Sequence, residues 1–124
     1  PALTRAEKLQ KRAARGGFDW PKIAPVLAKL EEELRELKDE INGGGKPERL
    51  ADEMGDVLFS CVNLARHLEL DPEDALRGTN AKFERRFRHL EADLADQGLD
   101  PKDLDITALE AAWKNSKTHD NSTD

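Results

Sequence analysis

Two pairs of acidic residues are the strongest chemical feature of the sequence, because the members of each pair are three residues apart. Glu33 and Glu36 form the first pair, and Glu53 and Asp56 form the second. Residues at this spacing lie on the same face of a helix, so each pair can present two carboxylates to one point. Carboxylate oxygens are ligands that suit Mg²⁺ or Mn²⁺, and these ions commonly accompany phosphates. The four residues are therefore a candidate divalent-metal site.

The same acids have a second interpretation, as part of a salt-bridged helical bundle. Carboxylates near a core are costly to leave unpaired, and either a metal ion or basic side chains can neutralise them. Lys29, Lys82 and Arg86 are the basic candidates. The spacing of the acids leaves both interpretations open.

Two long helices and a glycine turn would position the acids. Leucines recur in steps of three and four up to Ile41, and we expect Asp19 to cap that helix. A turn rich in glycine covers residues 42–47. A second helix then runs to about residue 68, with an apolar arc wide enough to need more than one neighbour. A short loop favours antiparallel packing, which would bring the two acidic pairs together.

Three further helices are expected from apolar periodicity and capping signals, at residues 4–15, about 72–95 and a short stretch from 107. Thr4 begins the first with a capping box, Asp71 caps the second, and Thr107 with Glu110 suggests a capping box for the third. The sequence predicts an all-α fold in one domain over residues 1–117, followed by a disordered polar tail at residues 118–124.

Composition narrows the class of function. The chain has 124 residues, 37% of them hydrophobic and 37% charged, and its formal net charge is −6. An acidic balance argues against general nucleic-acid binding. The sequence has no long apolar run, so we expect no membrane span. Cys61 is the only cysteine and cannot form an internal disulfide, which favours a reducing cytoplasm.

Residues towards the C-terminus are candidates for substrate binding. Lys82 and Arg86 lie one turn apart and could hold phosphates, or could be solvated. Asn80 lies in an apolar seam, where it could fix the register of packing or bind a base or sugar. Trp113, with Lys117 one turn later, could cover a nucleotide or could anchor the last helix.

Several of these motifs, taken in order, resemble the MazG family of nucleoside triphosphate pyrophosphohydrolases. The resemblance covers the chain from about Lys8 to Lys117 and is closest to the C-terminal catalytic domain of tandem-domain bacterial MazG proteins. A chain that starts at Pro1 is then expected to be a domain or processed product. The matching segments are Glu32-Glu33-x-x-Glu36, Glu53-x-x-Asp56, GFDW at 17–20, GDVLFSCVNLARHL at 55–68, NAKFERRF at 80–87 and the spacing of Trp113 and Lys117.

The resemblance implies an all-α MazG-like bundle assembled as a homodimer or higher homo-oligomer. It also implies Mg²⁺-dependent hydrolysis of a nucleoside triphosphate to the monophosphate and pyrophosphate, in nucleotide-pool cleaning or stress regulation. A narrower dUTP or dCTP pyrophosphatase and a non-catalytic helical dimerisation module are the alternatives. The implied metal ligands are Glu33, Glu36, Glu53 and Asp56, and the implied substrate-binding residues are Lys82, Arg86, Trp113, Lys117 and Asn80.

Overall fold

The computed structural model describes residues 1–119, and within this range it is all α, as predicted. The chain divides into two compact units, Pro1–Ala75 and a second unit from Leu76 onward, which are described separately. The elements are α1 (Ala2–Arg15), α2 (Ile23–Asn42), α3 (Pro47–His67), α4 (Pro72–Asp96), the 3₁₀ helix η1 (Pro101–Asp103) and α5 (Ile106–His119). Each helix within residues 1–119 is too short or too polar to cross a membrane.

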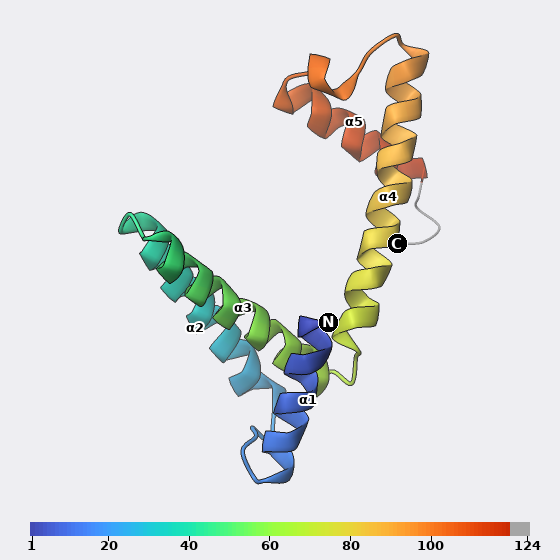
Figure 1. Ribbon diagram of the computed structural model, residues 1–124. Coiled ribbons are helices and arrows are strands. Elements are labelled where there is room, and N and C mark those ends of the chain that lie inside the picture. Colours follow the sequence, from blue (N-terminus) through green and yellow to red (C-terminus); the bar gives the residue numbers. More distant parts are fainter. Residues whose placement is uncertain (120–124) are drawn as a thin grey trace. The chain divides into compact units, whose positions relative to one another are not determined.

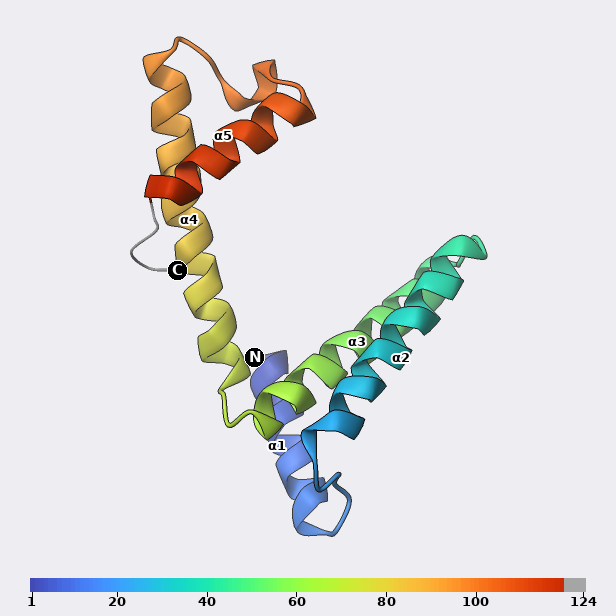
Figure 2. The same ribbon diagram turned by 180° about the vertical axis from the view of Figure 1, so that it is seen from behind.

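The first unit is built on a helical hairpin in which α2 and α3 run side by side, as both views show (Figures 1 and 2). Gly44 makes the turn with a φ of +72°, a conformation that suits glycine. Gly45 allows a close approach, because a Cβ there would lie 2.7 Å from the backbone oxygen of Glu40. Pro47 then occupies the first turn of α3. The hairpin confirms the predicted pairing of the two long helices.

Helix α1 packs on α3 and completes the first unit. The side chain of Gln10 donates a hydrogen bond from Nε2 to the backbone oxygen of Phe59 at 2.9 Å, which ties the two helices together. The buried apolar residues of this unit are few, namely Val26, Val57 and Val62. Several large apolar side chains on α2 and α3 remain exposed, among them Leu27, Leu34, Ile41, Leu58 and Phe59.

Two of the predicted helix starts in the first unit are wrong. Helix α1 begins at Ala2, so Thr4 lies inside it and does not cap it. Helix α2 begins at Ile23 with Lys22 at the N-cap. Asp19 does not cap α2, because its carboxylate is bonded to side chains of α3.

The second unit contains most of α4, together with η1 and α5. Leu90 and Leu94 of α4 are buried, and α5 packs back through Trp113, whose ring centroid lies 5.3 Å from that of Phe83. Asp71 caps α4 as predicted, since its Oδ1 accepts a hydrogen bond from the backbone nitrogen of Glu73 at 2.9 Å.

The start of α5 differs from the prediction. Asp105 caps this helix by accepting a 2.8 Å hydrogen bond from the backbone nitrogen of Ala108, so the predicted capping box at Thr107 is wrong. The helix continues to His119, two residues into the segment predicted as a tail. The rest of that segment, residues 120–124, lies outside the described residues. The assignment of residues 1–117 to one domain stays a prediction.

Candidate metal centre

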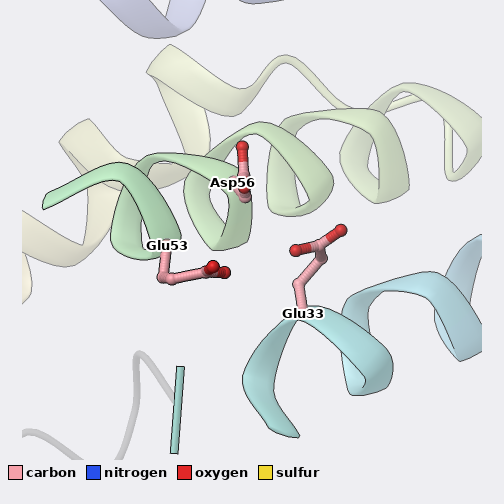
Figure 3. A group of neighbouring side chains, drawn as sticks. All are labelled: Glu33, Glu53 and Asp56. Atoms are coloured by element: carbon pink, nitrogen blue, oxygen red, sulfur yellow. The ribbon is translucent and has the colours of Figure 1, made fainter. Parts of the chain in front are cut away.

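Three carboxylates from the two helices of the hairpin converge. Glu33 comes from α2, and Glu53 and Asp56 come from α3; one oxygen from each lies within 4.8 Å of the others. Figure 3 shows the carboxylates of Glu33 and Glu53 directed toward one another across the space between the helices. The antiparallel hairpin thus brings together acids that are about twenty positions apart in the chain. Three of the four predicted carboxylates therefore meet, and the place of Glu36 beside them stays a prediction.

Burial and mutual repulsion set the electrostatics of the cluster. Burial raises the pKa of Glu53, and the nearby charge of Asp56 raises it further. The charge of Glu33 raises the pKa of Glu36, with desolvation as a second cause. Glu36 itself is exposed and does not belong to the three-carboxylate cluster. The charge of Glu33 nevertheless raises the pKa of Glu36, which indicates that the Glu36 side chain lies close to the cluster.

Basic side chains offset part of this negative charge. Lys29 lies one turn before Glu33, and its Nζ is 3.1 Å from Glu33 Oε1. The same ammonium group is 3.5 Å from Glu32. The hydrogen bond to Glu33 raises the pKa of Lys29, so the lysine stays charged. The salt-bridge interpretation thus applies to Glu33, and the charge of Arg49 offsets part of the negative charge around Glu53.

The donor set fits a hard divalent cation. Oε2 of Glu33 and Oε2 of Glu53 are both buried and accept no hydrogen bond. Leaving buried carboxylate oxygens unpaired is costly, and a cation would pair them. Ligand oxygens about 2.1 Å from a six-coordinate Mg²⁺ lie about 3.0 to 4.2 Å apart. A cluster already within 4.8 Å needs only a small inward shift to reach that spacing.

A cavity of about 230 Å³ adjoins the cluster in the same unit. Glu33 and Asp56 form part of its wall, and the remainder comes from α1, the segment at residues 16–22 and the later turns of α3. Most of the exposed cavity wall is apolar. The first unit therefore presents an acidic, metal-compatible cluster beside a pocket of molecular size.

A charged network that the sequence did not predict closes one side of this cavity. Arg66 donates from Nη2 to Asp19 Oδ1 at 2.8 Å and from Nη1 to Asp19 Oδ2 at 3.1 Å. His67 Nε2 lies 2.9 Å from the same Oδ1. The bond to Arg66 holds the pKa of Asp19 well below its usual range, with a smaller contribution from His67. The network fixes the segment that carries Phe18 and Trp20.

Five predicted site residues lie in the second unit. Lys82 is half-buried and Arg86 is buried, whereas Asn80 and Lys117 are exposed. Trp113 is half-buried against Phe83, which agrees with the anchoring interpretation of this tryptophan. Their roles in binding a substrate stay predictions.

Within the described residues the chain is all α, and it gathers carboxylates from two antiparallel helices into a cluster that could hold a metal ion, an arrangement known from helical bundles that bind metals. The family follows from comparison. A family model described as the MazG nucleotide pyrophosphohydrolase domain matches residues 23–91, which include all four predicted metal ligands. The chain belongs to this family.

Relatives from Escherichia coli and Thermotoga maritima carry names that agree with the family. The chain is 46% identical over 118 residues to a nucleoside triphosphate pyrophosphohydrolase of Escherichia coli (strain K12), covering 94% of this chain and 45% of that protein. It is 42% identical over 120 residues to the nucleoside triphosphate pyrophosphohydrolase/pyrophosphatase MazG of Thermotoga maritima. That match covers 97% of this chain and 46% of the relative. The chain is also 38% identical over 117 residues to the uncharacterized protein YabN of Bacillus subtilis (strain 168). That match covers 94% of this chain and 24% of YabN. The chain thus spans about half the length of the first two relatives.

Proposed function

We propose that this chain is a Mg²⁺-dependent pyrophosphohydrolase, which hydrolyses nucleoside or deoxynucleoside triphosphates to the monophosphate and pyrophosphate. The observation that carries the proposal is the convergence of Glu33, Glu53 and Asp56 with two buried carboxylate oxygens that lack partners. Membership of the MazG family and the names of the relatives supply the type of reaction. Nucleotide-pool cleaning or stress regulation is the physiological role that we attach to this activity.

In this proposal the carboxylates hold Mg²⁺, with Mn²⁺ as a substitute. Glu33, Glu53 and Asp56 are the ligands, and Glu36 joins them by a rotation of its exposed side chain. When bound, Mg²⁺ supplies positive charge that offsets the charge of the phosphates and favours attack by water. Lys29 orients Glu33 through the 3.1 Å ion pair. We assign Glu32, which is exposed and shares Lys29, either to support the metal ligands or to accept a proton from water.

The second unit contributes basic residues to the proposal. Lys82 and Arg86 lie one turn apart on α4 and carry the type of charge that stabilises phosphoryl oxygens. We assign them to the phosphates on the strength of the resemblance. Asn80, Trp113 and Lys117 are assigned to substrate binding on the same basis.

The proposal includes a homodimer as the functional form. The exposed leucines and Ile41 along α2, together with Leu58 and Phe59 on α3, form apolar surface that a second copy would cover. The single cysteine of the chain fits a reducing compartment, and we place the protein in the cytoplasm.

Release of pyrophosphate from a panel of ribo- and deoxyribonucleoside triphosphates, with and without Mg²⁺, tests the function. We expect metal-dependent release from several nucleotides. Glu53→Gln should remove the activity and leave the helical content unchanged, whereas Glu31→Gln, on an exposed acid of α2, should keep it. Turnover confined to dUTP or dCTP would establish the narrower enzyme. The proposal fails if well-folded protein turns over none of the panel.

A further inference from the structure

Helix α1 carries a row of positive charge on a chain whose formal net charge is −6. Five of its 14 residues are basic, and one, Glu7, is acidic. Four of the basic residues recur in steps of three and four, a spacing that places them along one side of the helix. These residues, which we call the basic row, are Arg5, Lys8, Arg12 and Arg15. The acidic balance of the whole chain therefore does not describe this helix.

The basic row lies on the side of α1 that does not pack. Gln10 lies on the opposite side of the helix, where it is buried and bonded to α3. All four residues of the basic row are exposed, and they line a groove together with Leu9 and Lys11. The row is thus open to a partner from solvent.

The charge of the basic row is not offset by neighbouring acids. Within residues 1–119, no carboxylate lies at ion-pair distance from any of its four side chains. Lys11 differs, because its Nζ lies 3.6 Å from Oε1 of Glu7. Like charges on successive turns of a helix repel one another. An anionic partner that contacts several of these side chains at once would offset that repulsion.

The shape of the basic row fits a phosphate backbone better than a protein surface. Successive charges are about 4.5 to 6 Å apart along the helix axis, and the row is about 15 Å long. A nucleic-acid strand needs only such a line of lysine and arginine side chains, which replace its counterions. A protein interface needs roughly 800 Å² from each partner and an apolar centre. Among the described residues that line the groove, Leu9 is the only apolar one.

We propose that the basic row of α1 binds a single-stranded nucleic acid through its phosphates, without preference for sequence. Phe18 favours a single strand over a duplex, because its side chain is 73% exposed and an unpaired base can stack on the ring. Leu9 lines both the groove and the neighbouring cavity, whose wall includes Phe18, so Leu9 connects the ring with the row. At physiological salt, charges farther away than about 8 Å are largely screened, so the net charge of the chain does not prevent this contact.

This binding surface is separate from the carboxylate cluster. No residue of the basic row belongs to the cluster or to the wall of the adjoining cavity. Binding of a strand therefore needs neither Mg²⁺ nor hydrolysis, and it can be measured in EDTA. A failure of the proposed function leaves this inference standing, and the reverse also holds.

Fluorescence anisotropy of a labelled twelve-nucleotide oligouridylate, titrated with the protein in EDTA, tests the inference. With four phosphate contacts, the association constant should fall about fiftyfold between 50 and 200 mM salt. The double variant Arg5→Gln/Arg12→Gln keeps two contacts, so its association constant should fall only about sevenfold over the same range. Arg35→Gln/Lys38→Gln is the matched control, because it removes two exposed positive charges from α2. The control should show the salt dependence of the wild type.

Three further measurements identify the kind of partner. Phe18→Leu should weaken binding of the oligouridylate about fivefold through loss of one stacked base, without changing the salt dependence. Equal or tighter binding of an RNA duplex of the same length overturns the assignment to single strands. Tighter binding of an oligoglutamate of the same charge overturns the assignment to nucleic acid. Absence of binding at 50 mM salt, or the same salt dependence in both double variants, overturns the basic row as a binding surface.

Discussion

Replacing Glu33 by glutamine tests whether the carboxylate cluster is built for a metal ion or for the stability of the fold. Glu33 is 7% exposed, pairs with Lys29 and faces the acids of α3. In a purely structural salt bridge, Glu33→Gln should destabilise the protein under all conditions. In a metal site, the substitution should remove the stabilisation by Mg²⁺ and relieve repulsion when the metal is absent.

The distances indicate which effect dominates without metal. With an effective dielectric constant of about 20, opposite charges 3.1 Å apart attract by about 5 kcal/mol. Two like charges within 4.8 Å repel by at least about 3.5 kcal/mol for each pair, and Glu33 faces two such charges. The side chain of Lys29 is 42% exposed, so solvent screens its charge. Screening therefore weakens the attraction between Lys29 and Glu33 more than the repulsion among the carboxylates. Repulsion therefore wins by a small margin.

We expect Glu33→Gln to raise the free energy of unfolding in EDTA by about 1 kcal/mol. Wild-type protein should gain about 1.4 kcal/mol from Mg²⁺ at ten times its dissociation constant, and the variant should gain almost nothing. Urea denaturation followed by circular dichroism, in EDTA and in a series of Mg²⁺ concentrations, measures both quantities. Glu31→Gln removes an exposed charge from the same helix and should match the wild type within about 0.5 kcal/mol.

One result would refute this reasoning. If Glu33→Gln destabilised the protein by the same amount in EDTA and in Mg²⁺, while wild-type protein gained nothing from Mg²⁺, the cluster would be a structural ion pair. The converging carboxylates would then owe their position to Lys29.

Three further predictions follow from other contacts of the first unit. Asp19→Asn should cost about 1 kcal/mol at pH 7 through loss of the two-bond pair with Arg66. Because the pKa of Asp19 is lowered in the folded protein, the wild-type advantage should hold above pH 4 and shrink as the pH falls below it, which urea denaturation across pH checks. Lys29→Met should tighten Mg²⁺ binding several-fold in calorimetric titrations, because the ammonium group competes with the cation for Glu33. Val62→Ala removes two methyl groups from a side chain that is 1% exposed and should lower the free energy of unfolding by about 2 kcal/mol.

The helices could be predicted from the sequence because their signals are local. Leucine periodicity, the glycine turn and the Asp71-Pro72 cap located the hairpin and the start of α4. The starts of α1, α2 and α5 were predicted wrongly, since several residues near each start can act as caps. Asp19 is a suitable cap by residue type, but Arg66 and His67 bind it from 47 and 48 positions away. Local sequence carries no signal for such a contact.

The carboxylate cluster could also be predicted, because helix periodicity and a short turn restrict where Glu33, Glu53 and Asp56 can lie. The cavity could not. Its wall joins α1 to α3 through Gln10 and Phe59, which are separated by 49 positions. A glutamine on a short charged helix looks like any solvated residue, and only the packing of α1 shows that Gln10 is buried.

Identification of the products of hydrolysis tests the central claim most directly. ³¹P NMR of ATP incubated with the protein and Mg²⁺ distinguishes pyrophosphate and AMP from orthophosphate and ADP. We predict resonances of pyrophosphate and AMP that grow together, and no reaction in EDTA or with Glu53→Gln. Formation of ADP and orthophosphate, or intact ATP in the presence of well-folded protein and Mg²⁺, would contradict the assignment of this cluster to pyrophosphohydrolysis.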